Sequence, residues 1–336
     1  MKHSHTLPVI GITMGDPVGI GPEILIKALN NSKLYDVCKP LIIGDSSIIK
    51  QALKLLAVRN PINIINDPEQ GKYVFNTLDI MDISILNLDC SNLLIPTVET
   101  GTAMQDYINK GIDLAMNNRI SGLVTCPITK TALKLAGSQF HGHTEMLAHR
   151  TNTQEYAMML AGKKLKVVLV TIHIPISQVS ASLTTENIIE KIRLTHFSLK
   201  NRFNIKAPKI AVAGLNPHSG EASMFGHEEE DIIAPAVRLA KKEGLDIHGP
   251  LPPDTVFFQA VNAKYDAVVC MYHDQGLIPF KLIHFKDGVN TTLGLPIIRT
   301  SVDHGTAYDI AWHGIADPSS LTEAIKMAAF QARNIK

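Results

Sequence analysis

Residues 209–218 read KIAVAGLNPH, an apolar, β-prone run that ends in a turn and a histidine. Two other stretches repeat this arrangement: residues 166–173 read KVVLVTIH, and residues 265–273 read YDAVVCMYH. In an open α/β sheet the carboxyl ends of parallel strands lie along one edge, so we expect the three terminal histidines to converge in space. These runs therefore predict both the type of sheet and the position of its functional edge.

The three strand-end histidines, His173, His218 and His273, predict a metal site. A single histidine in such a position is usually a surface residue or a core polar group with satisfied hydrogen bonds. Three of them, each beside polar or turn residues, favour metal ligation. Neutral imidazole suits zinc, cobalt, nickel or iron better than magnesium or calcium, and three protein ligands leave a position open for substrate. An open metal site indicates catalysis.

Short β-branched runs alternate with segments of helical periodicity along the chain. Strand-like runs begin near Pro8, Pro40 and Gly122, and apolar residues recur at helical spacing in segments such as 100–118 and 185–203. This alternation predicts an α/β fold with a mostly parallel sheet. Because 336 residues exceed the usual size of a single hydrophobic core, we expect two lobes.

The composition is that of an ordinary globular protein, with 45% hydrophobic and 19% charged residues and a formal net charge of +1. This charge gives no electrostatic reason to expect nucleic acid or an anionic membrane as a partner. No run approaches the ~18 apolar residues of a membrane span, and the start, MKHSHTLP, lacks the apolar stretch of a signal peptide. We therefore expect a cytoplasmic protein, whose cysteines are reduced, buried thiols because they form no CxxC pair: Cys38, Cys90, Cys126 and Cys270.

A glycine-rich turn follows the first predicted strand, where residues 14–23 read MGDPVGIGPE. Gly19 and Gly21 permit a tight turn and the close approach of a ligand, and Pro22 suits the first turn of a helix. The spacing does not match the GxGxxG fingerprint of dinucleotide-binding proteins, so a purely structural turn is an equal alternative.

A second motif stands near the C-terminus, where residues 301–318 read SVDHGTAYDIAWHGIADP. Together with the glycine-rich turn, it resembles the β-decarboxylating dehydrogenases of the isocitrate and isopropylmalate type. The resemblance implies a two-lobed α/β fold with a mostly parallel sheet and a central cleft. It also implies NAD or NADP as hydride acceptor, with Asp303, His304 and Gly305 as cofactor-binding residues.

The chain is more similar still to the 4-hydroxythreonine-4-phosphate dehydrogenase family of pyridoxal phosphate biosynthesis. The motifs that carry this resemblance span the chain nearly from end to end and in order. They are MGDPVGIGPE (14–23), HGHTE (141–145), GLNPHSGE (214–221), GPLPPDT (249–255), YHDQGLIPFK (272–281) and GLPIIRTSVDHGTAYD (294–309).

The family resemblance implies a set of substrate-binding and metal-binding residues. The metal ligands would be the three strand-end histidines already described. Lys281 and Arg299 would supply fixed positive charge for a phosphate or carboxylate, although either one alone is more simply a solvated surface charge. The other implied substrate-binding residues are His143, Thr144 and Asn290.

Two aspartates, Asp254 and Asp274, match aspartates that the family keeps at its active site. Asp274 directly follows the proposed ligand His273, so it could orient that histidine or help to move a proton. The sequence does not separate these two roles.

The implied activity is a metal-dependent, NAD- or NADP-linked oxidation and decarboxylation. The substrate would be 4-phosphooxy-L-threonine, and the product 3-amino-2-oxopropyl phosphate, in vitamin B6 biosynthesis. A sugar-acid relative that acts on D-threonate or D-erythronate 4-phosphate shares the same motifs and stays open as an alternative. A non-enzymatic module that binds a phosphorylated ligand would be expected to lack a metal ligand or part of the cofactor loop, and this chain has both.

The resemblance further implies one divalent ion per site and a homodimer with its active site near the subunit interface. Zinc is the expected metal, with magnesium or cobalt as alternatives. We expect a cofactor-side lobe of residues 1–127 and 301–336, and a metal-binding, substrate-binding and dimer-forming lobe of residues 128–300. The segment 222–226, ASMFG, is bulkier than the glycines of many relatives, and Trp312-His313 replaces small residues, so the cofactor preference stays open.

Overall fold

The computed structural model describes residues 7–84, 86, 95–140 and 142–335. The chain divides into two compact units. Unit 1 contains the described residues up to Gln154 together with Leu295–Asn334, and unit 2 contains Glu155–Gly294. Both units combine helices with mostly parallel strands, which confirms the predicted fold class.

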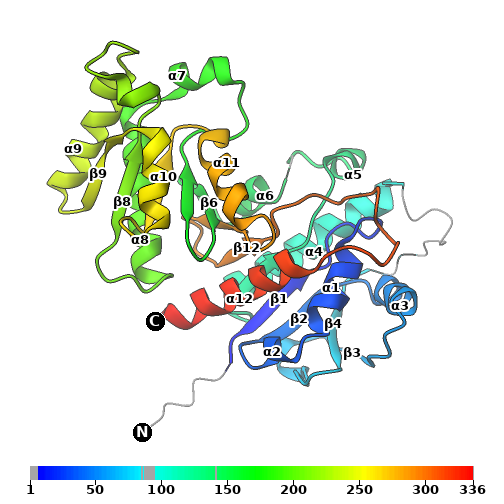
Figure 1. The fold of residues 1–336 in the computed structure, drawn as a ribbon. Coiled ribbons are helices and arrows are strands. Elements are labelled where there is room, and N and C mark those ends of the chain that lie inside the picture. Colours follow the sequence, from blue (N-terminus) through cyan, green and yellow to red (C-terminus); the bar gives the residue numbers. More distant parts are fainter. Residues whose placement is uncertain (1–6, 85, 87–94, 141, 336) are drawn as a thin grey trace, which may run out of the picture. The chain divides into compact units, whose positions relative to one another are not determined.

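The sheet of unit 1 is parallel throughout, with the strand order β3-β4-β2-β1-β5-β12 (Figure 1). Strand β1 lies inside this sheet, with Gly11 opposite both Leu41 and Leu123. The strands are β1 Val9–Thr13, β2 Lys39–Gly44, β3 Ile62–Ile64, β4 Leu78–Asp82, β5 Gly122–Thr125 and β12 Arg299–Ser301.

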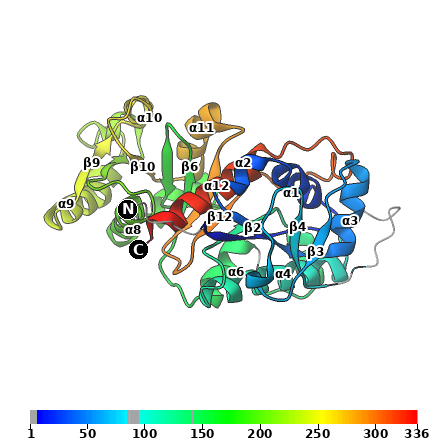
Figure 2. The same ribbon diagram turned by 90° about the horizontal axis from the view of Figure 1, so that it is seen from below.

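Helices cover both faces of this sheet, with α1 and α12 on one side and α4 on the other (Figure 2). Capping residues fix where some of them begin: the side chain of Asp45 accepts hydrogen bonds from Ser47 N and Ile48 N at the start of α3. The helices are α1 Gly21–Leu29, α2 Ser32–Tyr35, α3 Ser46–Leu55, η1 Pro68–Gln70, α4 Val98–Met116, α5 Lys130–Leu135, α6 His143–Arg150 and α12 Ser319–Asn334.

The strands of unit 2 follow the order β11-β6-β7-β10-β8-β9. The pairs from β7 to β9 are parallel, and β6 is antiparallel to both of its neighbours. The strands are β6 Ala157–Ala161, β7 Lys166–Leu169, β8 Lys209–Ala213, β9 Asp246–Leu251, β10 Ala267–Cys270 and β11 Val289–Leu293. The helices are η3 Ile176–Gln178, α7 Val179–Ser182, α8 Thr185–Asn201, η4 Pro217–Gly220, η5 Glu229–Ile233, α9 Ala234–Lys242, α10 Pro253–Val261 and α11 His273–His284.

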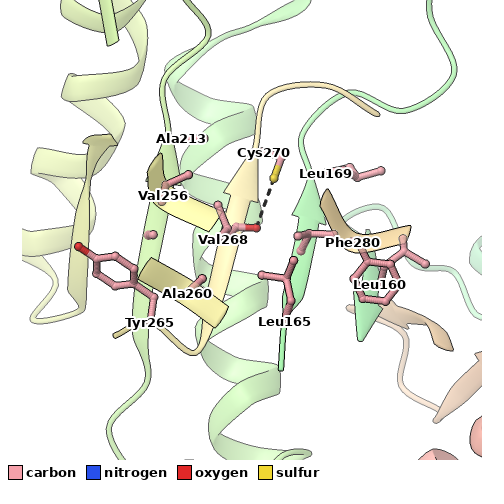
Figure 3. Packing of buried hydrophobic residues seen from close by; sticks show 12 residues of the cluster. Leu160, Leu165, Leu169, Ala213, Val256, Ala260, Tyr265, Val268, Cys270 and Phe280 are labelled. Carbon is pink, nitrogen blue, oxygen red and sulfur yellow. Dashed lines mark hydrogen bonds between the residues drawn. The ribbon is translucent and has the colours of Figure 1, made fainter. Parts of the chain in front are cut away.

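A hydrophobic core of unit 2 lies where α10 and α11 pack on the sheet (Figure 3). Val268 and Cys270 of β10 belong to this core, together with Val256 of α10 and Phe280 of α11. The intervening strand residue, Val269, is also fully buried. Burial of both faces is expected of a parallel strand covered by helices, and it explains why these strands read as continuous apolar runs in the sequence.

The boundaries of the units differ from those expected from the sequence, which placed residues 128–300 in one lobe. Helices α5 and α6 pack on α4, so the chain as far as Gln154 stays with unit 1. Strand β12 pairs with β5, so the return to unit 1 comes at Leu295 rather than at residue 301. Strand pairing and helix packing thus mark the divisions.

The described cysteines, Cys38, Cys126 and Cys270, are free and buried, as predicted, and Cys90 lies outside the described residues. Within the part of the chain that the structure describes, no helix combines the length and the apolar character needed to cross a membrane.

Candidate functional site

The three histidine-bearing segments follow adjacent parallel strands of unit 2, in the spatial order β7, β10, β8. His173 follows β7, His273 is the first residue of α11 after β10, and His218 lies in the turn after β8. All three histidines therefore stand at the same edge of the sheet, where the carboxyl ends of the strands lie.

His173 and His273 come close together, with ring centroids 5.5 Å apart. Both line a pocket of about 350 Å³. The other lining residues are Ile172, Ile174, Ile176, Val179, Tyr272 and Asp274. Two of the three predicted metal-binding residues, His173 and His273, therefore share one pocket.

His218 does not line this pocket, and its ring packs near Phe225, at a centroid distance of 6.2 Å. Among the described residues, no group of three or more histidine, cysteine or acidic side chains is close enough to hold a metal ion. The structure thus brings together two of the three predicted ligands, and the complete ligand set stays a prediction.

Hydrogen bonds tie the ends of the three strands to one another. The carboxamide of Gln275 accepts from Met271 N and donates to Gly214 O, each at 2.7 Å, and so joins the end of β10 to the end of β8. The hydroxyl of Thr171 donates to Met271 O at 2.7 Å and joins the end of β7 to that of β10. Sequence reasoning did not single out Gln275 or Thr171 as functional residues.

Asp274 lies directly beside His273, with its Oδ1 atom 2.7 Å from the Nδ1 atom of the imidazole. A carboxylate only accepts hydrogen bonds, so this contact favours the tautomer with a proton on Nδ1 and leaves Nε2 available as a metal ligand. Two imidazoles at one pocket, one of them oriented by a carboxylate, fit a divalent ion such as zinc or cobalt. Asp254, in contrast, is exposed in the first turn of α10 and does not line the pocket.

A group of polar and charged side chains gathers in unit 1 around Arg299, which is only 3% exposed. Its guanidinium donates to the Oγ1 atom of Thr125 at 2.9 Å, and burial lowers its pKa to about 10. His143, the first residue of α6, has its pKa held well below the usual value by burial and by the positive charge of Arg299. The Nε2 atom of His143 is buried and has no hydrogen-bond partner among the described residues. This cationic group, with Thr144 next along α6, could hold an anion.

The other two predicted substrate-binding residues belong to unit 2. Lys281 lies on α11, with its ammonium 5.8 Å from the centroid of the Phe285 ring. Asn290 lies on β11, and its Oδ1 atom is buried without a hydrogen-bond partner in the described part of the chain. The five predicted substrate-binding residues are therefore divided between the two units.

The two terminal motifs come into contact within unit 1. The backbone N–H of Ile20 donates to Thr306 O at 3.0 Å, and a Cβ atom added at Gly19 would lie 3.1 Å from Thr306 Cβ. Glycine at position 19 thus allows the close approach of the two loops. The predicted cofactor-binding residues Asp303, His304 and Gly305 stand directly before this contact.

A side-chain contact joins the same two loops. The hydroxyl of Tyr308 donates to the carboxylate of Asp16, which also accepts from Val18 N at 3.0 Å. Burial raises the pKa of Asp16, whereas the hydrogen bonds from Tyr308 and Val18 lower it. No feature of the sequence other than the two motifs indicated this pair.

Comparisons with known proteins agree with the motif pattern. A family model described as pyridoxal phosphate biosynthetic protein PdxA matches residues 36–328. A 4-hydroxythreonine-4-phosphate dehydrogenase from Desulforapulum autotrophicum is 62% identical over 97% of this chain and 96% of that protein. A D-threonate 4-phosphate dehydrogenase from Cupriavidus necator is 43% identical over 97% of this chain and 98% of that protein.

A solved structure gives the same result. The crystal structure of 4-hydroxythreonine-4-phosphate dehydrogenase from Klebsiella pneumoniae matches with a TM-score of 0.90 and 41% sequence identity. The match covers 98% of this chain and 99% of that chain.

Proposed function

The chain belongs to the pyridoxal phosphate biosynthetic protein PdxA family, and from that premise we propose that it oxidises and decarboxylates 4-phosphooxy-L-threonine with NAD or NADP. The secondary alcohol becomes a ketone as its carbon gives up hydride to nicotinamide and its hydroxyl gives up a proton. The carboxylate on the adjacent carbon then leaves as CO2, and that carbon takes up a proton. The product is 3-amino-2-oxopropyl phosphate. The observation that carries the proposal is the pair of imidazoles, His173 and His273, at one pocket beside the strand ends.

We propose that the cationic group around Arg299 helps to bind the phosphorylated substrate. A guanidinium presents several N–H donors in a planar fork that matches the oxygens of phosphate or carboxylate groups. Neutral His143 can donate or accept one further hydrogen bond through Nε2, which has no partner among the described residues. The other residues assigned to substrate binding are Thr144, Lys281 and Asn290.

We propose His173, His218 and His273 as ligands of one divalent ion, with zinc the first choice and cobalt or magnesium as alternatives. When bound, such an ion supplies a Lewis acid that lowers the pKa of the substrate hydroxyl and then polarises the carbonyl oxygen. Asp274 holds the imidazole of His273 in one tautomer and orientation. Asp254 and Asp274 are the candidates for moving the proton of the substrate hydroxyl.

The loop of Asp303, His304 and Gly305 is proposed to bind the nicotinamide cofactor. Its backbone is anchored at Asp303, whose N–H donates to the Oγ atom of Ser320 at 3.2 Å, and it leads into the contact with the glycine-rich turn. A loop held at both ends loses little freedom when a ligand binds, which favours tight and oriented binding.

The alternative substrate is D-threonate or D-erythronate 4-phosphate. The 43% identity to the enzyme from Cupriavidus necator supports this alternative, and the proposed metal-binding and phosphate-binding residues do not distinguish an amino group from a hydroxyl group at the neighbouring carbon. Turnover of the two substrate types, measured side by side with both cofactors and a saturating metal, separates the two functions.

We also propose a cytoplasmic homodimer whose active site is completed at the subunit interface. Helix α11 and the residue after it present exposed apolar side chains: Ile278 is 67%, Leu282 86% and Phe285 77% exposed. Exposed apolar side chains grouped in this way are typical of an interface. Sedimentation analysis of Leu282→Asp tests this proposal, because a buried charge at the interface should yield monomers, and an unchanged dimer would exclude this surface.

Replacing His218 by alanine tests the central proposal. We expect NADH or NADPH formation to fall by at least about tenfold at saturating zinc, cobalt or manganese, together with weaker metal binding. Near-normal turnover and metal affinity in this variant would remove His218 from the metal site. His227→Ala is the matched control, because His227 is an exposed histidine in the segment that follows the same turn.

A further inference from the structure

The carboxylate of Glu229 is buried beneath the turn that carries His218. Glu229 is only 3% exposed, whereas its neighbour Glu230 is exposed. Its Oε1 atom accepts the backbone N–H groups of Leu215 and Asn216, each at 2.7 Å, and its Oε2 atom accepts from Asn216 Nδ2 at 2.9 Å.

Two glycines allow the backbone of this turn to close around the carboxylate. A Cβ atom added at Gly220 would lie 2.9 Å from Oε2 of Glu229, and one added at Gly214 would lie 3.0 Å from Oε1. Gly226 likewise allows the side chain of Asn216 to come close to the backbone, since a Cβ atom added at Gly226 would lie 2.4 Å from Asn216 Nδ2. A side chain at these positions would push the backbone away from the Glu229 carboxylate.

The turn itself has an unusual backbone conformation. Residues 218–223 all have positive φ, with values of 52°, 57°, 80°, 43°, 54° and 67°, and only Gly220 among them is a glycine. Side chains of L-residues disfavour this left-handed region, so such a run persists only where the surroundings fix it. His218 is the first residue of the run and follows the segment that Glu229 holds by only two positions.

The segment before the run is fixed at both ends. Gly214 O accepts from Gln275, and Leu215 and Asn216 donate to Glu229. The N–H of Ser219 then donates to Asn216 O at 3.1 Å. This hydrogen bond links the fixed segment to the left-handed run. The direction in which His218 leaves the strand end is therefore set by these contacts rather than by its own side chain.

We infer that Glu229 is a positioning residue for His218: its buried carboxylate fixes the backbone of Leu215 and Asn216, so that the left-handed turn presents the imidazole in one direction. This inference rests on the proposed metal site. Glu229 acts through the backbone and touches neither the imidazole nor the reacting atoms.

The test is a titration of the metal-free, full-length protein with Co²⁺, followed by the d–d absorption of the bound ion. Glu229→Ala removes all three contacts, and we expect the Kd for Co²⁺ to rise about 10- to 100-fold, with an altered spectrum. Glu229→Gln keeps an acceptor for the two backbone N–H groups but sets a donor against Asn216 Nδ2, so we expect a loss at the lower end of this range. Glu230→Ala, at the exposed neighbour, should match the wild-type protein.

Kinetics supply a second measurement. In Glu229→Ala, kcat should fall while KM for the nicotinamide cofactor stays constant, because the cofactor loop belongs to unit 1. Wild-type Co²⁺ affinity and spectrum in both Glu229 variants would overturn the inference, as would an equal loss in Glu230→Ala. If Glu229→Ala does not fold, Glu229→Gln decides alone by the same criterion.

His218→Ala separates the failure of this inference from that of the proposed function. Weak Co²⁺ binding in His218→Ala with wild-type binding in the Glu229 variants would overturn only the positioning role. Wild-type binding in His218→Ala would overturn the proposed metal site, and the role of Glu229 with it.

Discussion

The hydroxyl of Tyr308 donates a hydrogen bond to the buried carboxylate of Asp16, although the two residues are 292 positions apart in the chain. Asp16 is fixed on its other side, because it accepts from Val18 N and its own N–H donates to Pro127 O at 2.8 Å. The glycine-rich turn and the C-terminal loop thus behave as one structural element of unit 1. We therefore expect ligand binding at one of these loops to depend on the conformation of the other.

Replacing Tyr308 by phenylalanine should weaken cofactor binding. The change leaves a buried acceptor without one of its donors, which costs about 1–3 kcal/mol and lowers the melting temperature. It also frees the loop that begins at Asp303, so we expect KM for NAD or NADP to rise several-fold while KM for the phosphorylated substrate stays constant. Steady-state kinetics and thermal unfolding measure the two effects.

Tyr73→Phe is the control for that variant. Its hydroxyl donates to Pro68 O within unit 1, away from both terminal motifs, so its removal should lower stability without changing cofactor KM. A rise in cofactor KM of the same size in both variants would contradict a specific role for Tyr308.

His143 should make the protein sensitive to mild acid. Burial and the charge of Arg299 hold its pKa well below the usual value, so the folded protein keeps it neutral. The unfolded chain takes up a proton near pH 6.5, and the folded chain does so only at lower pH. The free energy of unfolding should therefore decrease as the pH falls below about 6.5 and until the folded pKa is passed.

His143→Gln removes this titration, so the unfolding free energy of the variant should depend less steeply on pH between about 7.5 and 5 than that of the wild-type protein. Urea unfolding at several pH values measures the slopes. An unchanged slope in His143→Gln would show that the imidazole titrates alike in both states.

Replacing Arg299 by lysine should weaken the grip on phosphate while preserving the charge. Lysine lacks the planar guanidinium that donates to Thr125 Oγ1 at 2.9 Å and that can donate twice to an anion. A hydrogen bond to a charged group contributes about 1.5–3 kcal/mol, so we expect KM for the 4-phosphorylated substrate to rise about 10- to 100-fold.

The unphosphorylated analogue distinguishes the role of Arg299. Its turnover should change little in Arg299→Lys, and an equal loss on both substrates would exclude a phosphate-specific contact. Arg150→Lys is the control, because Arg150 forms an exposed ion pair with Asp113 and such pairs contribute little.

The sequence predicted the features that depend on local pattern. The strands β7, β8 and β10 are largely buried on both faces, so they read as apolar runs, and the histidine after each run predicts a functional edge. Gln275 and Glu229 leave no such signal, because their hydrogen bonds reach backbone groups of other segments: Gly214 O for Gln275, and the N–H groups of Leu215 and Asn216 for Glu229. Glu229 in particular stands within the run 228–230, where nothing in the sequence separates the buried carboxylate from its exposed neighbour.

The backbone conformation at His218 was equally beyond prediction. Its left-handed turn contains only one glycine among residues 218–223, so the usual sequence signal for positive φ is missing. The strand end predicted where the histidine stands along the sheet edge, but the direction of its side chain depends on the turn. The sequence therefore predicted the strand-end placement of all three histidines but not the conformation of the turn that carries His218.

Asp274→Asn separates the two roles that Asp274 could have. If the carboxylate orients His273 through the 2.7 Å contact to Nδ1, the amide should raise the Kd for Co²⁺ about 10- to 100-fold, because it no longer enforces one tautomer. If Asp274 only moves a proton, Co²⁺ affinity should stay constant and the pH profile of kcat should lose one limb. We expect the first outcome, because the carboxylate already contacts the imidazole and the Asp274 side chain is 67% exposed.

Asp254→Asn is the control for metal affinity, since Asp254 does not line the pocket of His173 and His273. Equal losses of Co²⁺ affinity in the two variants would exclude a specific orienting role for Asp274.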